Sequence, residues 1–163
     1  EMLIAPMSAY EIVFGYVLGS VVRALVIANL IAAIGAIFVH TLPHNWALYF
    51  AVMIVVSILF SALGIIFGLI AEKFDHIAVL TTFVITPLVF VGGVFTSAQL
   101  LPPAIRNFEL VNPMFYTIDA FRYSYTGQSY LPLWLSTSAI TVLAALALAI
   151  ALRMTLLGYK LRT

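Results

Sequence analysis

Long apolar runs alternate with short polar breaks along the chain, and four of the runs are long enough to cross a membrane as helices. A helix needs about 20 apolar residues to cross the hydrocarbon core of a bilayer. The four runs cover about 12–39, 46–71, 77–95 and 131–152. The pattern therefore predicts an all-α polytopic membrane protein with four transmembrane helices.

The stretch between the third and fourth runs, residues 96–130, is too polar to span a membrane by itself. Pro102-Pro103 and Asn112-Pro113 favour the starts of two short helices, because proline suits the first helical turn and asparagine caps it. Asp119 and Arg122 are three residues apart and are expected to pair on the second helix. Aromatic residues typical of a membrane interface follow the same stretch: Phe108, Phe115, Tyr116, Phe121, Tyr123 and Tyr125. We expect re-entrant or interfacial helices here, and a simple interfacial loop is the alternative.

Composition supports the membrane assignment and excludes several functions. Hydrophobic residues make up 64% of the 163 residues and charged residues only 8%, whereas a soluble domain carries about 25% charged residues. A net charge of +1 offers no basic patch for nucleic acid, and the absence of cysteine excludes disulfides and thiolate metal sites. His40 and His44 are four residues apart, but Pro43 lies in the same turn and disrupts helical spacing, so we expect no metal site.

The positions of lysine and arginine predict the orientation of the spans, since basic residues favour the cytoplasmic side. Four basic residues fall on one side and two on the other: Lys73, Arg153, Lys160 and Arg162 against Arg106 and Arg122. We therefore expect both termini and the loop near residue 73 to be cytoplasmic. The turn after the first run and the stretch 96–130 then lie outside.

The third run contains threonines and a proline within apolar sequence. Pro87 cannot donate a hydrogen bond to the carbonyl of Phe83, so a kink is expected there. Threonine hydroxyls can satisfy backbone groups freed by the proline, which is a purely structural interpretation. The functional interpretation is that one face of this helix lines a translocation pathway, through Thr82, Phe83, Thr86, Pro87 and Phe90.

Two further features concern how helices pack. Gly15-x3-Gly19 and Gly64-x3-Gly68 are patterns that allow close approach of two helices in a membrane. Arg23 is the one charge inside a predicted span. Its side chain either pairs with an acidic group on another helix or extends to the inner interface along its long aliphatic stem.

No motif for catalysis or nucleotide binding is visible in the sequence: it has no phosphate-binding loop, no zinc-protease motif and no nucleophile elbow. The four runs also contain no Asp, Glu or His. Ion-driven carriers usually place ionisable groups at membrane depth. We therefore expect any uphill transport to draw its energy from another chain. The alternative is a channel or secondary carrier that is not driven by ATP.

Three separate blocks resemble the C-terminal signature of the ABC-2 type permeases, the membrane subunits of type V ABC exporters. The blocks are Gly92-Gly93-Val94-Phe95, Leu100-Leu101-Pro102-Pro103 and the run from Asn112-Pro113 to Arg122, with Gly127 following. The opening residues 1–8 look like the segment that couples such permeases to their ATPase. The resemblance covers the whole chain in order and spacing.

The resemblance implies a half-transporter in the bacterial inner membrane. Family members have six spans, so residues 1–163 would form an ABC-2 type transmembrane domain that lacks the first two; a complete four-helix protein is the alternative. Two permease copies would form a homodimer, and two cytoplasmic ATPase subunits would bind ATP and Mg²⁺, leaving no cofactor in this chain. The substrate would be amphipathic: a lipid-linked saccharide, a lipid or a drug.

The resemblance also implies roles for individual residues. Coupling to the ATPase would involve Glu1, Met2, Leu3, Pro6 and Ser8, together with Glu72, Lys73 and Asp75. The outer gate would involve Phe95, Leu101, Pro102, Asn112, Pro113, Tyr116, Asp119 and Arg122.

Overall fold

The computed structural model describes residues 8–71, 79, 81–94 and 109–158. The described part is all-helical, as predicted. In chain order its elements are α1 (Ala9–Phe38), α2 (Trp46–Ile70), the π-helical η1 (Thr81–Ile85), α4 (Thr86–Val89), the π-helical η2 (Phe90–Val94), α6 (Pro113–Thr126) and α7 (Leu133–Leu156). Within it, three helices are long and apolar enough to cross a membrane: α1, α2 and α7. They correspond to the first, second and fourth predicted spans.

α1 begins three residues before the predicted start, and a capping box explains why. Ser8 Oγ accepts a hydrogen bond from the backbone N–H of Glu11 at 3.3 Å, and the backbone N–H of Ser8 donates to Glu11 Oε2 at 2.7 Å. Ser-x-x-Glu is a known sequence signal for a helix start. A 30-residue helix is about 45 Å long, so α1 exceeds the roughly 30 Å of hydrocarbon that it has to cross.

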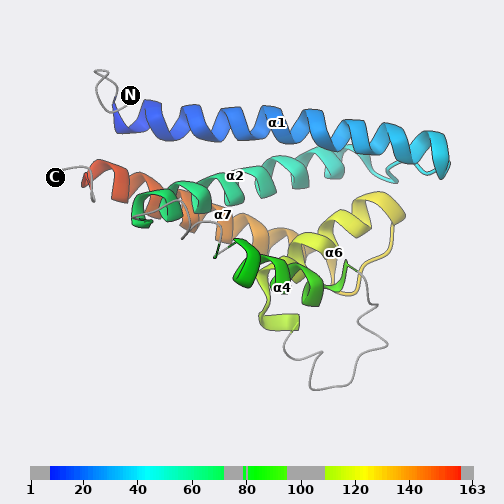
Figure 1. Ribbon diagram of the computed structural model, residues 1–163. Helices are drawn as coiled ribbons and strands as arrows, with labels where there is room; N and C mark the ends of the chain where they lie inside the picture. The colour runs from blue at the N-terminus through cyan, green and yellow to red at the C-terminus, as the bar shows by residue number, and fades with distance from the viewer. Residues whose placement is uncertain (1–7, 72–78, 80, 95–108, 159–163) are drawn as a thin grey trace.

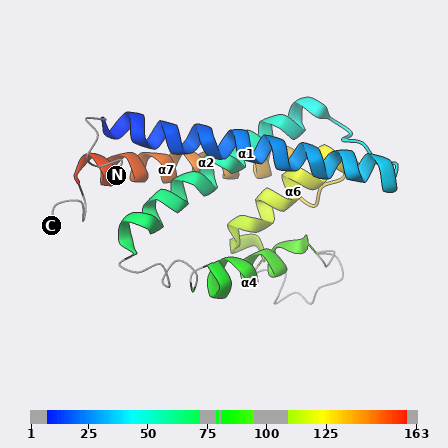
Figure 2. The same cartoon turned by 45° about the horizontal axis from the view of Figure 1, so that its top comes forward.

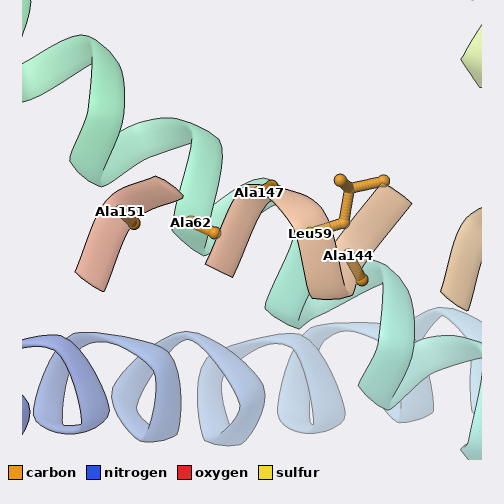
Figure 3. Close-up of a cluster of buried hydrophobic side chains, with 5 residues drawn as sticks. All are labelled: Leu59, Ala62, Ala144, Ala147 and Ala151. Carbon is orange, nitrogen blue, oxygen red and sulfur yellow. The ribbon is translucent and has the colours of Figure 1, made fainter. Parts of the chain in front are cut away.

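Small side chains bring α2 and α7 together. Leu59 and Ala62 of α2 form a buried cluster with three alanines of α7, at positions 144, 147 and 151 (Figure 3). Alanines spaced three and four residues apart leave one face of a helix flat, so that a second backbone can approach it closely. The helix extends beyond the predicted end at residue 152, to Leu156.

The two glycine patterns do not make such contacts. A Cβ atom built on Gly15, Gly19, Gly64 or Gly68 meets no heavy atom within 4 Å. Among the described residues these patterns therefore mediate no close approach of helices, and their role in packing stays a prediction. The close approach is made by alanines instead, and the four glycines face open space.

The third predicted span is irregular in the structure. Its described part contains a short apolar helix, Thr82–Val94, in which π-helical turns flank the single α-helical turn of α4. Thirteen residues extend about 20 Å, which is less than the bilayer core, so a fourth span stays a prediction. Pro87 lies where the geometry changes from π to α. The residue with non-helical backbone angles in η2 is Gly93, with φ of 87°, and the kink expected at Pro87 stays a prediction.

Figures 1 and 2 show α1, α2 and α7 running side by side, with the start of α1 and the end of α7 at the same end of the bundle. α6 lies toward the other end, where the turn between α1 and α2 is bonded to it. The backbone N–H of His44 donates to the carbonyl of Tyr125 at 3.2 Å, and that of Asn45 donates to the carbonyl of Ser124 at 3.0 Å. The turn and α6 therefore share one end, as the orientation prediction requires.

Candidate functional site

The start of α6 is tied to the irregular helix by Asn112, whose side chain is 2% exposed. Asn112 Oδ1 accepts from the backbone N–H of Met114 at 2.9 Å, which caps the helix, and Pro113 occupies the first turn. Asn112 Nδ2 donates to the carbonyl of Leu88 at 2.6 Å. The predicted cap is confirmed, and the same side chain also connects α6 to α4.

The two glycines of η2 allow α6 to pack directly against its backbone. A Cβ on Gly92 would lie 2.9 Å from Ile118 Cδ1 and 3.1 Å from Met114 Cβ, closer than the 3.5–4.0 Å or so of normal carbon contacts. Gly93 has a positive φ that side chains of L-residues rarely adopt. Glycine therefore suits both positions for different reasons: a side chain at 92 would press on α6, and a side chain at 93 would strain the backbone.

Asp119 is buried, with 1% of its side chain exposed, and joins α6 to the start of α7. Its Oδ1 accepts from the backbone N–H of Tyr130 at 2.7 Å, and its Oδ2 accepts from Ser136 Oγ at 2.7 Å. Both distances are typical of charge-assisted hydrogen bonds. The carboxylate thus holds three parts of the chain together: α6, the connection before α7, and the first turn of α7.

Arg122 connects α6 to the end of η2 by a different route. Its Nη2 donates to the carbonyl of Gly93, and its guanidinium lies 4.5 Å from the ring centroid of Tyr130. The predicted ion pair between Asp119 and Arg122 is therefore wrong: the two side chains bind different partners. Arg122 bonds to the end of η2, while the carboxylate of Asp119 bonds to Ser136 and to the backbone of Tyr130.

We call these residues the α6 junction: Leu88, Gly92, Gly93, Asn112, Asp119, Arg122, Tyr130 and Ser136. Four predicted outer-gate residues belong to it or border it, namely Asn112, Pro113, Asp119 and Arg122. Tyr116 instead makes a local contact, since its hydroxyl donates to the carbonyl of Leu110 at 2.7 Å. The gate residues Phe95, Leu101 and Pro102 lie outside the described residues.

The other predicted sites are described only in part. The coupling residues Glu1, Met2, Leu3, Pro6, Glu72, Lys73 and Asp75 lie outside the described residues. Ser8 is described, and it caps α1. The predicted pathway residues have exposed side chains on the irregular helix: Thr82, Phe83, Thr86, Pro87 and Phe90. Arg23 is exposed on α1 and lines a shallow hollow with Glu11 and the glycines at 15 and 19.

Sequence reasoning missed several members of the junction. Ser136 is fully buried on α7. It begins the short polar run Ser136-Thr137-Ser138 in an otherwise apolar helix, which is a signal for a polar partner nearby. Phe115 was expected at a membrane interface, but it is only 3% exposed and stacks on Tyr130 with ring centroids 6.4 Å apart. Part of the predicted aromatic belt is therefore protein core.

The long apolar helices and the junction define a polytopic membrane protein with a buried polar contact between short helices. The chain belongs to the ABC-2 type transporter family, whose sequence profile matches residues 1–126. No solved structure matches it significantly.

The chain is 40% identical over 133 residues to the inner membrane transport permease YadH of Escherichia coli K12. The matched region covers 82% of this chain and 52% of that protein. It is equally similar to YadH of Shigella flexneri. It is 27% identical over 129 residues to nodulation protein J of Rhizobium leguminosarum bv. viciae, covering 78% of this chain and 49% of that protein. The chain spans about half the length of these curated relatives.

Proposed function

We propose that this chain forms part of the permease of an ATP-driven ABC exporter in the bacterial inner membrane. The observation that carries the proposal is the match of residues 1–126 to the ABC-2 type transporter family. The similarity to inner membrane transport permeases and the three long apolar helices support the location. The substrate is amphipathic, either a lipid-linked saccharide, a lipid or a drug.

In this proposal the chain supplies the last four of six spans, and the segment 77–95 completes the fourth of them. Two permease copies pair, and ATP and Mg²⁺ bind to partner ATPase subunits in the cytoplasm. Both termini of this chain are cytoplasmic. The orientation is supported by the basic residues and by the common end of α1 and α7 in Figure 1.

The described helices offer a mechanical route from the coupling residues to the α6 junction. Residues 1–8 meet the ATPase, and Ser8 caps α1, so a displacement there moves a helix about 45 Å long as a rigid body. The far end of α1 leads into the turn whose His44 and Asn45 bond to α6. A push on α1 therefore reaches α6 through backbone hydrogen bonds.

At the junction, the contacts divide into two sets. Asp119 holds α6 to Ser136 of α7 and to the backbone N–H of Tyr130 in the connection before α7, so α6 and α7 move together. The irregular helix is held to α6 by single bonds, from Arg122 to Gly93 and from Asn112 to Leu88. Opening of the outer gate separates the irregular helix from α6, and substrate passes along its exposed face of Phe83, Thr86 and Phe90.

The test is ATP-driven transport by the assembled complex. The permease is co-purified with its ATPase subunit and reconstituted in vesicles, and movement of a fluorescent lysophospholipid is followed with and without ATP. We expect movement only with ATP. Ion conduction, or equal movement without ATP, would contradict the proposal and favour a channel or secondary carrier.

A variant tests the junction as the gate. Arg122→Gln removes a hydrogen bond to a charged group, typically about 1.5 kcal/mol or tenfold in an equilibrium. Because opening of the gate breaks this bond, we expect ATP-independent movement of the lysophospholipid to rise by up to that factor, while ATP hydrolysis continues. Arg153→Gln is the matched control, since Arg153 is exposed at the opposite end of α7. Unchanged ATP-independent movement in Arg122→Gln would remove the junction from the mechanism.

A further inference from the structure

An open groove of about 770 Å³ lies between α1 and α2, with Thr155 of α7 at its edge. Its walls extend from Ile12 to Ala24 on α1 and from Val56 to Leu69 on α2. Segments of 13 and 14 residues correspond to about 20–21 Å of helix, or nearly four turns. On its lining, Ser20 Oγ donates to Ser61 Oγ at 3.1 Å, and most of the remaining lining is apolar.

Glycines form part of the walls, and in the described part of the chain no neighbouring helix packs onto the face where their side chains would be. Gly64 and Gly68 line the groove, Gly15 and Gly19 line a second hollow that adjoins it, and no heavy atom lies within 4 Å of a Cβ built at any of the four. A glycine inside a helix costs about 1 kcal/mol relative to alanine. Against fluid lipid tails nothing offsets that cost, whereas a second helix packed closely on the glycines does offset it.

We propose that this groove is occupied by one further apolar transmembrane helix of the permease. This helix belongs to the region of the permease that corresponds to the unmatched half of the relatives' sequences. The inference rests on the proposed function. It is supported by the relatives' lengths, since the matched region covers only 52% of YadH and 49% of nodulation protein J.

The shape of the surface favours a helix over a second copy of this chain. A two-fold symmetric contact uses the same patch on both copies, so the patch has to be complementary to itself. A concave groove between two helices is not self-complementary, but it accepts the convex face of a single helix. The docked helix spans the groove at the level of Gly64 and Gly68, where its backbone approaches α2.

The test uses spin labels, because the chain has no cysteine and a single introduced one reports alone. Gly64→Cys and Gly68→Cys are labelled separately in the complete permease, assembled with its ATPase in phosphatidylcholine–phosphatidylglycerol vesicles. Ile150→Cys is the control: Ile150 is 50% exposed on α7 and outside the groove, and it lies about as many turns from the start of its helix as Gly64 does from the start of α2. Collision rates with oxygen and with a water-soluble nickel chelate are measured.

A docked helix predicts low collision rates with both reagents at positions 64 and 68, and a high oxygen rate at position 150. A high oxygen rate at 64 and 68 would show lipid in the groove, and a high nickel rate would show an aqueous path. Strong dipolar broadening between labels at position 64 of two copies would show a second copy. Each of these three results would overturn the inference.

A second variant covers the case in which the labels perturb assembly. The double variant Gly64→Leu, Gly68→Leu should lower the melting temperature of the complete permease, because the added side chains would displace the docked helix. Ile150→Leu should leave the melting temperature unchanged. An unchanged melting temperature in the double variant would overturn the inference. ATP-driven transport by the unmodified permease is measured in the same preparation. Transport with a lipid-filled groove overturns only the docking inference, and a covered groove without ATP-driven transport overturns only the proposed function.

Discussion

Replacing Gly92 by alanine tests the contact between η2 and α6. The added Cβ would lie 2.9 Å from Ile118 Cδ1, 3.1 Å from Met114 Cβ and 3.3 Å from the Met114 carbonyl carbon. Ile118 Cδ1 is the end of a flexible side chain and can rotate away. The two Met114 atoms belong to α6 near its cap, so α6 itself has to move by a few tenths of an ångström to restore normal contact.

That displacement strains the hydrogen bond between Asn112 and Leu88. Overpacking of this kind typically costs about 1–3 kcal/mol, while replacing glycine by alanine within a helix returns about 0.5–1 kcal/mol. We expect a net loss of about 1–2 kcal/mol in the free energy of unfolding, which changes the folded-to-unfolded ratio about 5- to 30-fold. Denaturation by SDS in mixed micelles, followed by tryptophan fluorescence, measures this loss.

Gly35→Ala is the matched control for the same substitution. A Cβ on Gly35 would lie 3.8 Å from Thr41 Oγ1 and 3.9 Å from the Tyr125 hydroxyl, which is ordinary van der Waals contact. We expect this variant to be unchanged or more stable by about 0.5–1 kcal/mol. Equal effects of the two substitutions would refute the argument that α6 is packed on the backbone of Gly92.

Three further substitutions have defined outcomes in the same denaturation assay. Ser136→Ala removes the hydroxyl that donates to the buried carboxylate of Asp119 at 2.7 Å, and it should cost about 1–2 kcal/mol in the free energy of unfolding. Ser138→Ala, at an exposed hydroxyl, should have almost no effect. Equal costs would contradict the assigned partner. Ala147→Leu adds volume to the α2–α7 contact and should cost about 1–3 kcal/mol, and a neutral result would contradict that close packing. Asn45→Ala removes a helix cap alone and should cost about 1 kcal/mol. Asn112→Ala should cost more, because the Asn112 side chain also bonds to Leu88 of α4. Equal losses would refute the role of Asn112 in joining α6 to α4.

The sequence alone predicted the elements whose causes are local. Apolar runs of sufficient length indicated α1, α2 and α7, because the bilayer requires such runs whatever their neighbours are. The cap at Asn112 was predicted because a cap bonds to its own helix within three residues. The early start of α1 carried an equally local signal in Ser8 and Glu11, which the assignment by hydrophobicity overlooked.

The partners of polar side chains were decided only by the tertiary structure. Asp119 and Arg122 are neighbours on one helix, yet their partners Ser136 and Gly93 lie 17 and 29 residues away. The local spacing favoured an ion pair between Asp119 and Arg122. In the packed structure Asp119 instead accepts from Ser136, and Arg122 donates to the carbonyl of Gly93. The glycine and alanine patterns look alike in the sequence. In the structure the alanines of α7 pack on α2, whereas the glycines border an open groove. Only the tertiary structure distinguishes them, because close approach depends on which element lies opposite.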